Sequence, residues 1–175
     1  EYKPYDTRFG DVPPLASFGS GYRFHVTGLN KAEDGFPTTR ADLVQAEEER
    51  QVRKVEKAID DIVTYEEYLL DDAEIAVVAF GSISRSARFA VNEARKRGIR
   101  AGLFRIITYW PFPERQIRAL GQRVKAIITP EMNLGMTIHE VRRCVEGRAP
   151  VSGIFRVDGE PINPGQILAA IQEVR

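Results

Sequence analysis

The segment Glu74-Ile-Ala-Val-Val-Ala-Phe80, followed by Gly81-Ser-Ile-Ser84, is the strongest indication of the fold in this sequence. A short apolar run without polar interruptions is typical of a parallel strand that is buried on both faces of its sheet. The glycine turns the chain, and Ser84 is expected to be the N-cap of a helix that ends at Gly98. A buried strand that turns directly into a helix predicts an α/β fold.

The same strand-then-helix order continues to the end of the chain. Amphipathic helical patterns separate three more apolar strands, which we predict at residues 101–107, 124–129 and 153–157. A last helix begins at Asn163-Pro-Gly-Gln166, where the asparagine caps, the proline occupies the first turn and the glutamine can reach back. Strands that alternate with helices predict a three-layer α/β/α fold around a mostly parallel sheet.

The N-terminal part of the chain has a different composition. Residues 1–40 are rich in proline and glycine, with little periodicity apart from a strand-like alternation at 22–27. A long amphipathic helix is predicted over residues 41–70, with a break near Thr64. We therefore expect an irregular connector or arm over residues 1–40, lying across another domain, and an α/β domain over residues 41–175. The chain lacks an initiator methionine, which suggests that it comes from a longer protein.

Composition and charge narrow the possible functions. Lys plus Arg and Asp plus Glu number 25 each, and this zero net charge argues against a nucleic-acid partner, because phosphate binding needs excess cations. No apolar run approaches the ~20 residues of a membrane span, and residues 1–9 do not resemble a signal peptide. The single cysteine, Cys144, fits a packed thiol in a reducing compartment. We therefore expect a cytoplasmic protein that binds neither nucleic acid nor membrane.

Two segments at strand ends carry candidate site residues. The turn at 81–86 follows a strand and opens a helix, so its backbone N–H groups could hold a phosphate with help from Arg85. The segment lacks a full G-x-G-x-x-G or G-x-x-x-x-G-K-[ST] motif, so a purely structural turn is the simpler interpretation. Glu131 and Asn133 could face a ligand at the carboxyl edge of the sheet. Alternatively, Asn133 caps the following helix and Glu131 interacts favourably with the positive end of that helix. The candidate ligand or interface residues are Gly81, Ser82, Ser84, Arg85, Glu131 and Asn133.

Residue types and spacing indicate no catalytic residue and no metal site. His25 and His139 are far apart and lack Cys or His neighbours at ligand spacing, and His139 beside Glu140 is more typical of an exposed helical pair than of a catalytic base. There is no nucleophile elbow and no cysteine cluster for an iron–sulfur centre. Prolines stiffen the aromatic segment Tyr109-Trp-Pro-Phe-Pro113, which could anchor another protein surface or close the end of the sheet as a lid.

Several segments, in order along the chain, resemble the α chains of 2-oxoacid:ferredoxin oxidoreductases. The resemblance begins with a connector that contains Phe24-His-Val-Thr-Gly-Leu29. One departure is Lys31, where the family often has a histidine. The other matching segments are Ala79-Phe-Gly-Ser-Ile-Ser-Arg-Ser-Ala87, Gly102-Leu-Phe-Arg-Ile-Ile-Thr-Tyr-Trp-Pro-Phe-Pro113 and Glu131-Met-Asn-Leu-Gly135.

The resemblance implies that this chain is the transketolase C-terminal-like domain of such an α subunit. Enzymes of the family use thiamine diphosphate with magnesium, iron–sulfur clusters and CoA to convert a 2-oxoacid to an acyl-CoA, and they pass electrons to ferredoxin. The thiamine-binding domains would lie in the preceding part of the α chain and in the β subunit. No catalytic or cofactor-binding residue of the family is therefore carried onto this chain. The connector favours a 2-oxoglutarate-type enzyme.

Two hypotheses about function follow from the sequence. The first is a non-catalytic structural or assembly domain of such an oxidoreductase, which pairs with the preceding thiamine-binding domain and with the β subunit. The second is a small-ligand module that binds CoA or a nucleotide at the carboxyl edge of the strands.

Overall fold

The computed structural model describes residues 1–175, which divide into two compact units, Glu1–Asp60 and Asp61–Arg175. The first unit contains a 3₁₀ turn, η1 (Thr7–Phe9), and the long helix α1 (Ala41–Lys57). It extends to Asp60, past the division that we expected after residue 40, because α1 contacts the arm. The short helix α2 (Ile59–Ile62) contains the boundary between the units.

Two basic side chains of α1, Arg50 and Lys57, hold the arm against the helix, and a buried ion pair within α1 positions the first of them. The Arg50 guanidinium donates to the Glu47 carboxylate at 2.6 Å, and both side chains are buried. Arg50 also donates to the backbone oxygen of Asp11, and Lys57 pairs with the Asp11 carboxylate. The strand-like alternation at 22–27 does not form a strand: the arm has one isolated bridge, between Lys31 and Pro37.

The second unit is built on a single sheet of five strands in the order β1-β3-β2-β4-β5. All neighbours are parallel except β1, which runs antiparallel to β3 at one edge. The fold class expected from the sequence is thus confirmed. The strands are β1 (Tyr65–Tyr68), β2 (Ile75–Phe80), β3 (Ala101–Ile106), β4 (Ala126–Glu131) and β5 (Val151–Phe155). The helices are α3 (Ile83–Lys96), α4 (Glu114–Arg123), α5 (Thr137–Val145) and α6 (Pro164–Glu173).

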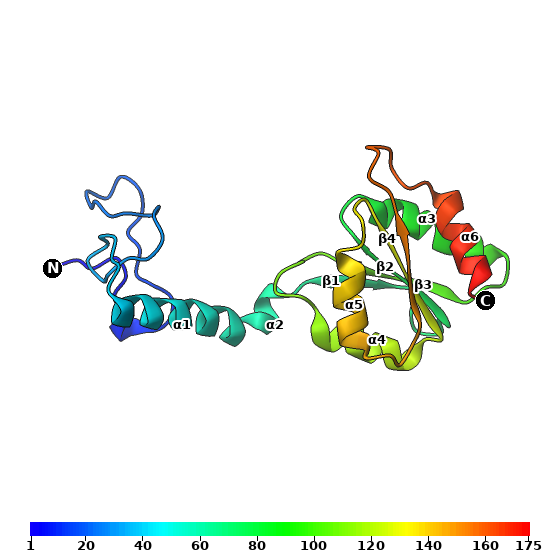
Figure 1. Ribbon diagram of the computed structural model, residues 1–175, viewed down its shortest axis with the longest axis horizontal. Helices are drawn as coiled ribbons and strands as arrows, with labels where there is room; N and C mark the ends of the chain where they lie inside the picture. The colour runs from blue at the N-terminus through cyan, green and yellow to red at the C-terminus, as the bar shows by residue number, and fades with distance from the viewer. The chain divides into compact units, whose positions relative to one another are not determined.

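The central strands are apolar throughout because helices cover both faces of the sheet. Successive side chains of a strand point to opposite faces. Accordingly, Val77 of β2 belongs to the core beneath α3 and α6, whereas Val78 belongs to the core beneath α4 and α5. Figure 1 shows α3 beside α6 and α4 beside α5. Cys144 is fully buried in the second of these cores, as expected for a packed thiol.

The order of the strands creates a crevice between β2 and β4. From β2 the chain passes through α3 to β3 on one side, and from β3 it passes through α4 to β4 on the other side of β2. The segment that leaves β2 leads into α3 and the segment that leaves β4 leads into α5. Because α3 and α5 cover opposite faces of the sheet, these two segments diverge. Open α/β sheets bind ligands at such a reversal of strand order.

Two further local predictions were wrong. The predicted helix over 41–70 ends earlier, and Tyr65–Tyr68 forms an edge strand in which Glu66 pairs with Arg105 of β3. The N-cap of α3 is Ser82 rather than Ser84, and its side chain makes no capping hydrogen bond. By contrast, the capping box at the start of α6 is confirmed, with Asn163 and Gln166 bonded reciprocally.

Gly102 of β3 is required by a close approach of the backbone that leaves β1. A Cβ at this position would lie 2.5 Å from the Leu69 carbonyl oxygen and 2.6 Å from Leu70 Cδ2. We expect Gly102→Ala to lower the free energy of unfolding, measured by urea denaturation, by about 2 kcal/mol because the backbone must shift. Gly165→Ala is the matched control: its Cβ would meet only Asn163 Oδ1, at 3.1 Å, and alanine favours the helix. Equal stability of the two variants would contradict this prediction.

Candidate functional site

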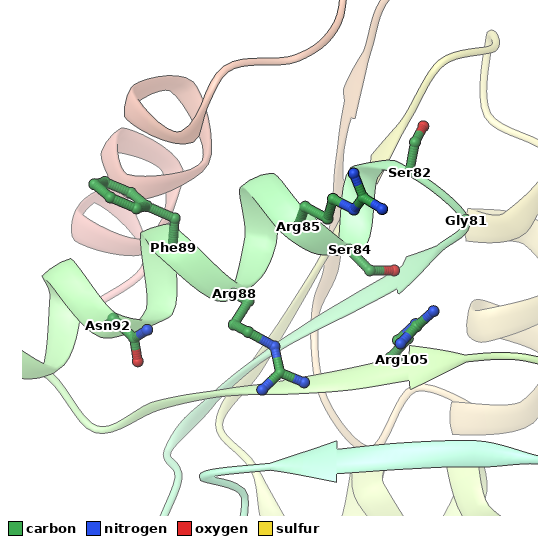
Figure 2. A pocket seen from close by; sticks show the side chains of 8 residues that line it. All are labelled: Gly81, Ser82, Ser84, Arg85, Arg88, Phe89, Asn92 and Arg105. Atoms are coloured by element: carbon green, nitrogen blue, oxygen red, sulfur yellow. The ribbon is translucent and has the colours of Figure 1, made fainter.

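Two cavities meet at the start of α3, at the carboxyl edge of the sheet. The smaller, of 240 Å³, lies in the crevice between the ends of β2 and β4. The larger, of 720 Å³, extends along α3 beside β3 (Figure 2). The structure thus gathers the six sequence candidates at one edge: Glu131 and Asn133 line the smaller cavity, Ser84 and Arg85 the larger, and Gly81 and Ser82 both.

The Glu131 carboxylate is committed to the start of α5. It is buried, and its oxygens accept hydrogen bonds from the backbone N–H groups of Met136, Thr137 and Ile138 at 3.0, 2.6 and 2.8 Å. Three orphan donors at a helix start are thereby satisfied by a negative charge, which also interacts favourably with the helix dipole. These hydrogen bonds give the buried Glu131 carboxylate a structural role at the start of α5. A direct role in ligand contact stays a prediction.

Asn133 shapes the same loop. Its Oδ1 accepts from the N–H groups of Gly135 and Met136 at 2.7 and 2.8 Å, an arrangement that closes the turn before α5. Gly135 adopts a left-handed backbone with φ of 97°, and the Phe155 ring and Ile138 leave little space beside it. The loop that follows β4 is therefore organised by its own side chains.

The turn at the start of α3 is more open. Gly81 has a φ of 67°, and nothing lies within 4 Å of where a Cβ would stand. Ser84 is the second residue of α3 and is buried, and its hydroxyl oxygen has no hydrogen-bond partner. Arg85 is exposed and makes no ion pair. Unlike the loop after β4, this turn leaves polar groups uncommitted.

The larger cavity contains two arginines that the sequence argument did not single out. Arg88 of α3 pairs with Glu66 of β1 and lies 4.2 Å from the Tyr68 ring centroid, and Arg105 of β3 lies 3.4 Å from the same carboxylate. The hydrogen bond from Arg88, together with the charges of both arginines, lowers the pKa of Glu66. The Arg105 Nε atom is buried and has no hydrogen-bond partner. These side chains meet only because β1 adds to the sheet beside β3.

The aromatic segment divides its side chains between core and surface. Phe112 is buried, and Tyr109 packs against both Phe112 and Phe80 with ring centroids 5.8 and 5.0 Å apart. Trp110, in contrast, is 73% exposed. It belongs to a set of exposed apolar side chains at the ends of β2, β3 and β4, which we call the carboxyl-edge apolar surface. Its members are Phe80, Ile107, Trp110, Met132, Leu134 and Met136.

Among the cofactors implied by the resemblance, a magnesium ion and an iron–sulfur cluster do not fit the donor groups of this chain. No group of three or more His, Cys, Asp or Glu side chains is arranged to hold a metal ion. Burial raises the pKa of the Cys144 thiol, and no second cysteine exists to ligate an iron–sulfur cluster.

No helix of the structure has both the length and the apolar character needed to cross a membrane.

Comparison with known proteins identifies the family. The family model for pyruvate:ferredoxin oxidoreductase core domain II matches residues 73–167, which is more than half of the chain. The 2-oxoglutarate synthase subunit KorA of Methanothermobacter thermautotrophicus is 38% identical over 172 residues, which cover 98% of this chain and 46% of that protein. The chain thus spans about half the length of the curated relatives it matches.

Solved structures agree on the fold. A 2-oxoglutarate:ferredoxin oxidoreductase from Magnetococcus marinus, solved with 2-oxoglutarate, coenzyme A and succinyl-CoA bound, matches 99% of this chain and 30% of its own, with a TM-score of 0.79 and 21% identity. A split-gene transketolase matches 63% of this chain and 42% of its own, with a TM-score of 0.55 and 20% identity. The α/β unit is therefore similar to the transketolase C-terminal-like domain. The chain belongs to the pyruvate:ferredoxin oxidoreductase core domain II family, as a domain of a 2-oxoacid:ferredoxin oxidoreductase α subunit.

Proposed function

We propose that this chain is a non-catalytic structural and assembly domain of a thiamine-diphosphate-dependent 2-oxoacid:ferredoxin oxidoreductase. The carboxyl-edge apolar surface is the observation that carries the proposal. Its six large apolar side chains, all exposed, follow three adjacent strands. Large apolar side chains exposed together at one edge of a sheet are typical of protein interfaces, and an exposed tryptophan is typical of an interface anchor.

The partners that we propose for this surface are the thiamine-binding parts of the same enzyme. One is the domain that precedes this chain in the α subunit, and the other is the β subunit. The names of the relatives support a multi-subunit enzyme, because they describe subunits. We infer that thiamine diphosphate, magnesium, the iron–sulfur clusters and CoA bind elsewhere in the whole enzyme, and that ferredoxin accepts its electrons.

We propose 2-oxoglutarate as the substrate of the whole enzyme. The 2-oxoglutarate synthase relatives reach 38% identity across nearly the full chain, whereas a ketoisovalerate oxidoreductase subunit is 44% identical over 64% of it. Full-length similarity, which includes the connector, therefore supports the 2-oxoglutarate type.

We propose that residues 1–40 form an interdomain connector. The arm exposes large apolar side chains that would be unfavourable in water if the arm were free. Phe18 and Leu29 are more than 90% exposed, and Phe9 is 78% exposed. Packing of these side chains against the preceding thiamine-binding domain would remove their apolar surface from water. In this proposal the connector precedes an α/β domain over residues 41–175, and α1 is the part of that domain on which the connector packs.

Replacing the tryptophan tests the assembly role. In the whole α subunit, we expect Trp110→Ala to weaken binding to the β subunit, measured by biolayer interferometry, by about 30-fold, a loss typical of a buried aromatic anchor. Phe89→Ala is the matched control, because Phe89 is also exposed but lies on α3, outside the carboxyl-edge apolar surface. If both variants bind the β subunit like the unaltered protein, this surface is not the interface.

A further inference from the structure

We propose that the 720 Å³ cavity along α3 is an anion site that binds a phosphate-bearing ligand. Its walls come from the turn after β2, one side of α3, and β3 (Figure 2). The inference is independent of the assembly role, since the carboxyl-edge apolar surface and this cavity share no residue. The lining residues are Gly81, Ser82, Ser84, Arg85, Arg88, Phe89, Asn92 and Arg105.

The cavity has an excess of positive charge. Three arginines line it, namely Arg85, Arg88 and Arg105, and one carboxylate, that of Glu66, pairs with the latter two. Arg85 makes no ion pair, so the cluster carries two positive charges beyond the neutralising carboxylate. A guanidinium presents donors in a planar fork that matches phosphate oxygens. The charge surplus therefore suits a dianionic group.

Two buried polar atoms at this cavity have no partner in the protein. Ser84 is only 5% exposed, and neither its hydroxyl oxygen nor the Arg105 Nε atom makes a hydrogen bond. In Figure 2 the Ser84 hydroxyl and the Arg105 guanidinium lie on the same side of α3, below the Gly81 turn. Buried polar groups are normally paired, so these two atoms favour a ligand whose oxygens can accept from both.

The start of α3 adds a third attraction for an anion. The helix has fourteen residues, and its first turn carries no acidic side chain. Its positive dipole end is therefore not neutralised locally. Gly81 leaves open space beside the turn, which lets a ligand approach the backbone. The excess positive charge, the two unpaired polar atoms and the positive end of the α3 dipole all lie at the same cavity.

The cavity is longer than a single phosphate. It extends along α3 from Ser82 to Asn92, which at the rise of an α-helix corresponds to about 15 Å. Inorganic phosphate, pyrophosphate and a nucleoside diphosphate share the chemistry that the arginines recognise. They differ in how much of this length they occupy, and a binding experiment can distinguish them.

Calorimetric titration of the 175-residue chain with phosphate, pyrophosphate and ADP tests the proposal. We expect saturable binding of pyrophosphate that weakens about tenfold in Arg85→Gln and in Arg105→Gln, because each loses a charged hydrogen bond to phosphate. Arg97→Gln, at the other end of α3 and away from the cavity, is the matched control and should bind normally. Tighter binding of ADP than of pyrophosphate would assign a nucleotide, and equal binding would assign the phosphate groups alone.

A variant that should bind pyrophosphate more tightly distinguishes loss of the site from partial unfolding of the protein. Glu66→Gln removes the carboxylate that occupies Arg88 and Arg105, so it should tighten pyrophosphate binding about threefold. A structural defect would weaken binding instead. The proposal is overturned if no probe gives saturable heat at low salt, or if Arg85→Gln and Arg105→Gln bind pyrophosphate like the unaltered chain.

Discussion

Phe104→Ala is expected to lower the free energy of unfolding by about 4 kcal/mol, the largest effect of any substitution considered for this chain. Phe104 lies in β3 and is fully buried in the core beneath α4 and α5. The ring of Tyr65 stacks on it with centroids 5.1 Å apart, so truncation also removes the contact that fixes the edge strand. The cavity that remains cannot refill easily, because the surrounding sheet is paired on both sides.

Urea denaturation followed by far-ultraviolet circular dichroism measures this effect. Phe89→Ala serves as the control, because Phe89 is 57% exposed and its truncation should cost less than about 1 kcal/mol. If Phe104→Ala were no more destabilising than Phe89→Ala, the packing of β1 and β3 described above would be incorrect.

Glu131→Ala is expected to lower the free energy of unfolding by about 3 kcal/mol. The substitution leaves the backbone N–H groups of Met136, Thr137 and Ile138 without their acceptor, and two of these three hydrogen bonds are buried. Glu131→Gln keeps an oxygen acceptor but loses the charge at the helix start, so we expect an intermediate loss.

The same denaturation measurement distinguishes a local capping role from a general effect of removing negative charge. Glu140→Gln changes a carboxylate within α5 itself, but one that pairs with the exposed Arg143. Such a surface pair contributes little, and we expect a change within about 0.5 kcal/mol. Similar losses in Glu131→Ala and Glu140→Gln would mean that Glu131 does not organise α5.

The sequence was sufficient to predict the central part of the sheet. The runs that form β2, β3 and β4 are apolar because both of their faces are covered, and this property is visible without a structure. The capping box at Asn163 is likewise local, since all of its hydrogen bonds join residues three apart. The edge strand β1 escaped prediction because Tyr65-Glu-Glu-Tyr68 becomes a strand only by pairing with β3.

Part of the candidate site could also be predicted from the sequence. Strand ends alone placed Gly81 and Glu131 at one edge of the sheet, and the structure confirms that placement. Arg105 and Glu66 were missed because they meet only through the pairing of β1 with β3, which the sequence did not reveal. The unpaired state of Ser84 also depends on three-dimensional packing and has no signature in sequence.

The central claim is that reaction chemistry comes from polypeptide other than this chain. Its most direct test is the rate of 2-oxoglutarate-dependent ferredoxin reduction, measured with thiamine diphosphate, magnesium and CoA present. We expect no turnover above the buffer background for the purified chain, and turnover once the complete α and β subunits are supplied. Ferredoxin reduction by the chain alone that disappears in a variant of an exposed residue, such as Arg85→Gln, would show that the chain carries reaction chemistry of its own.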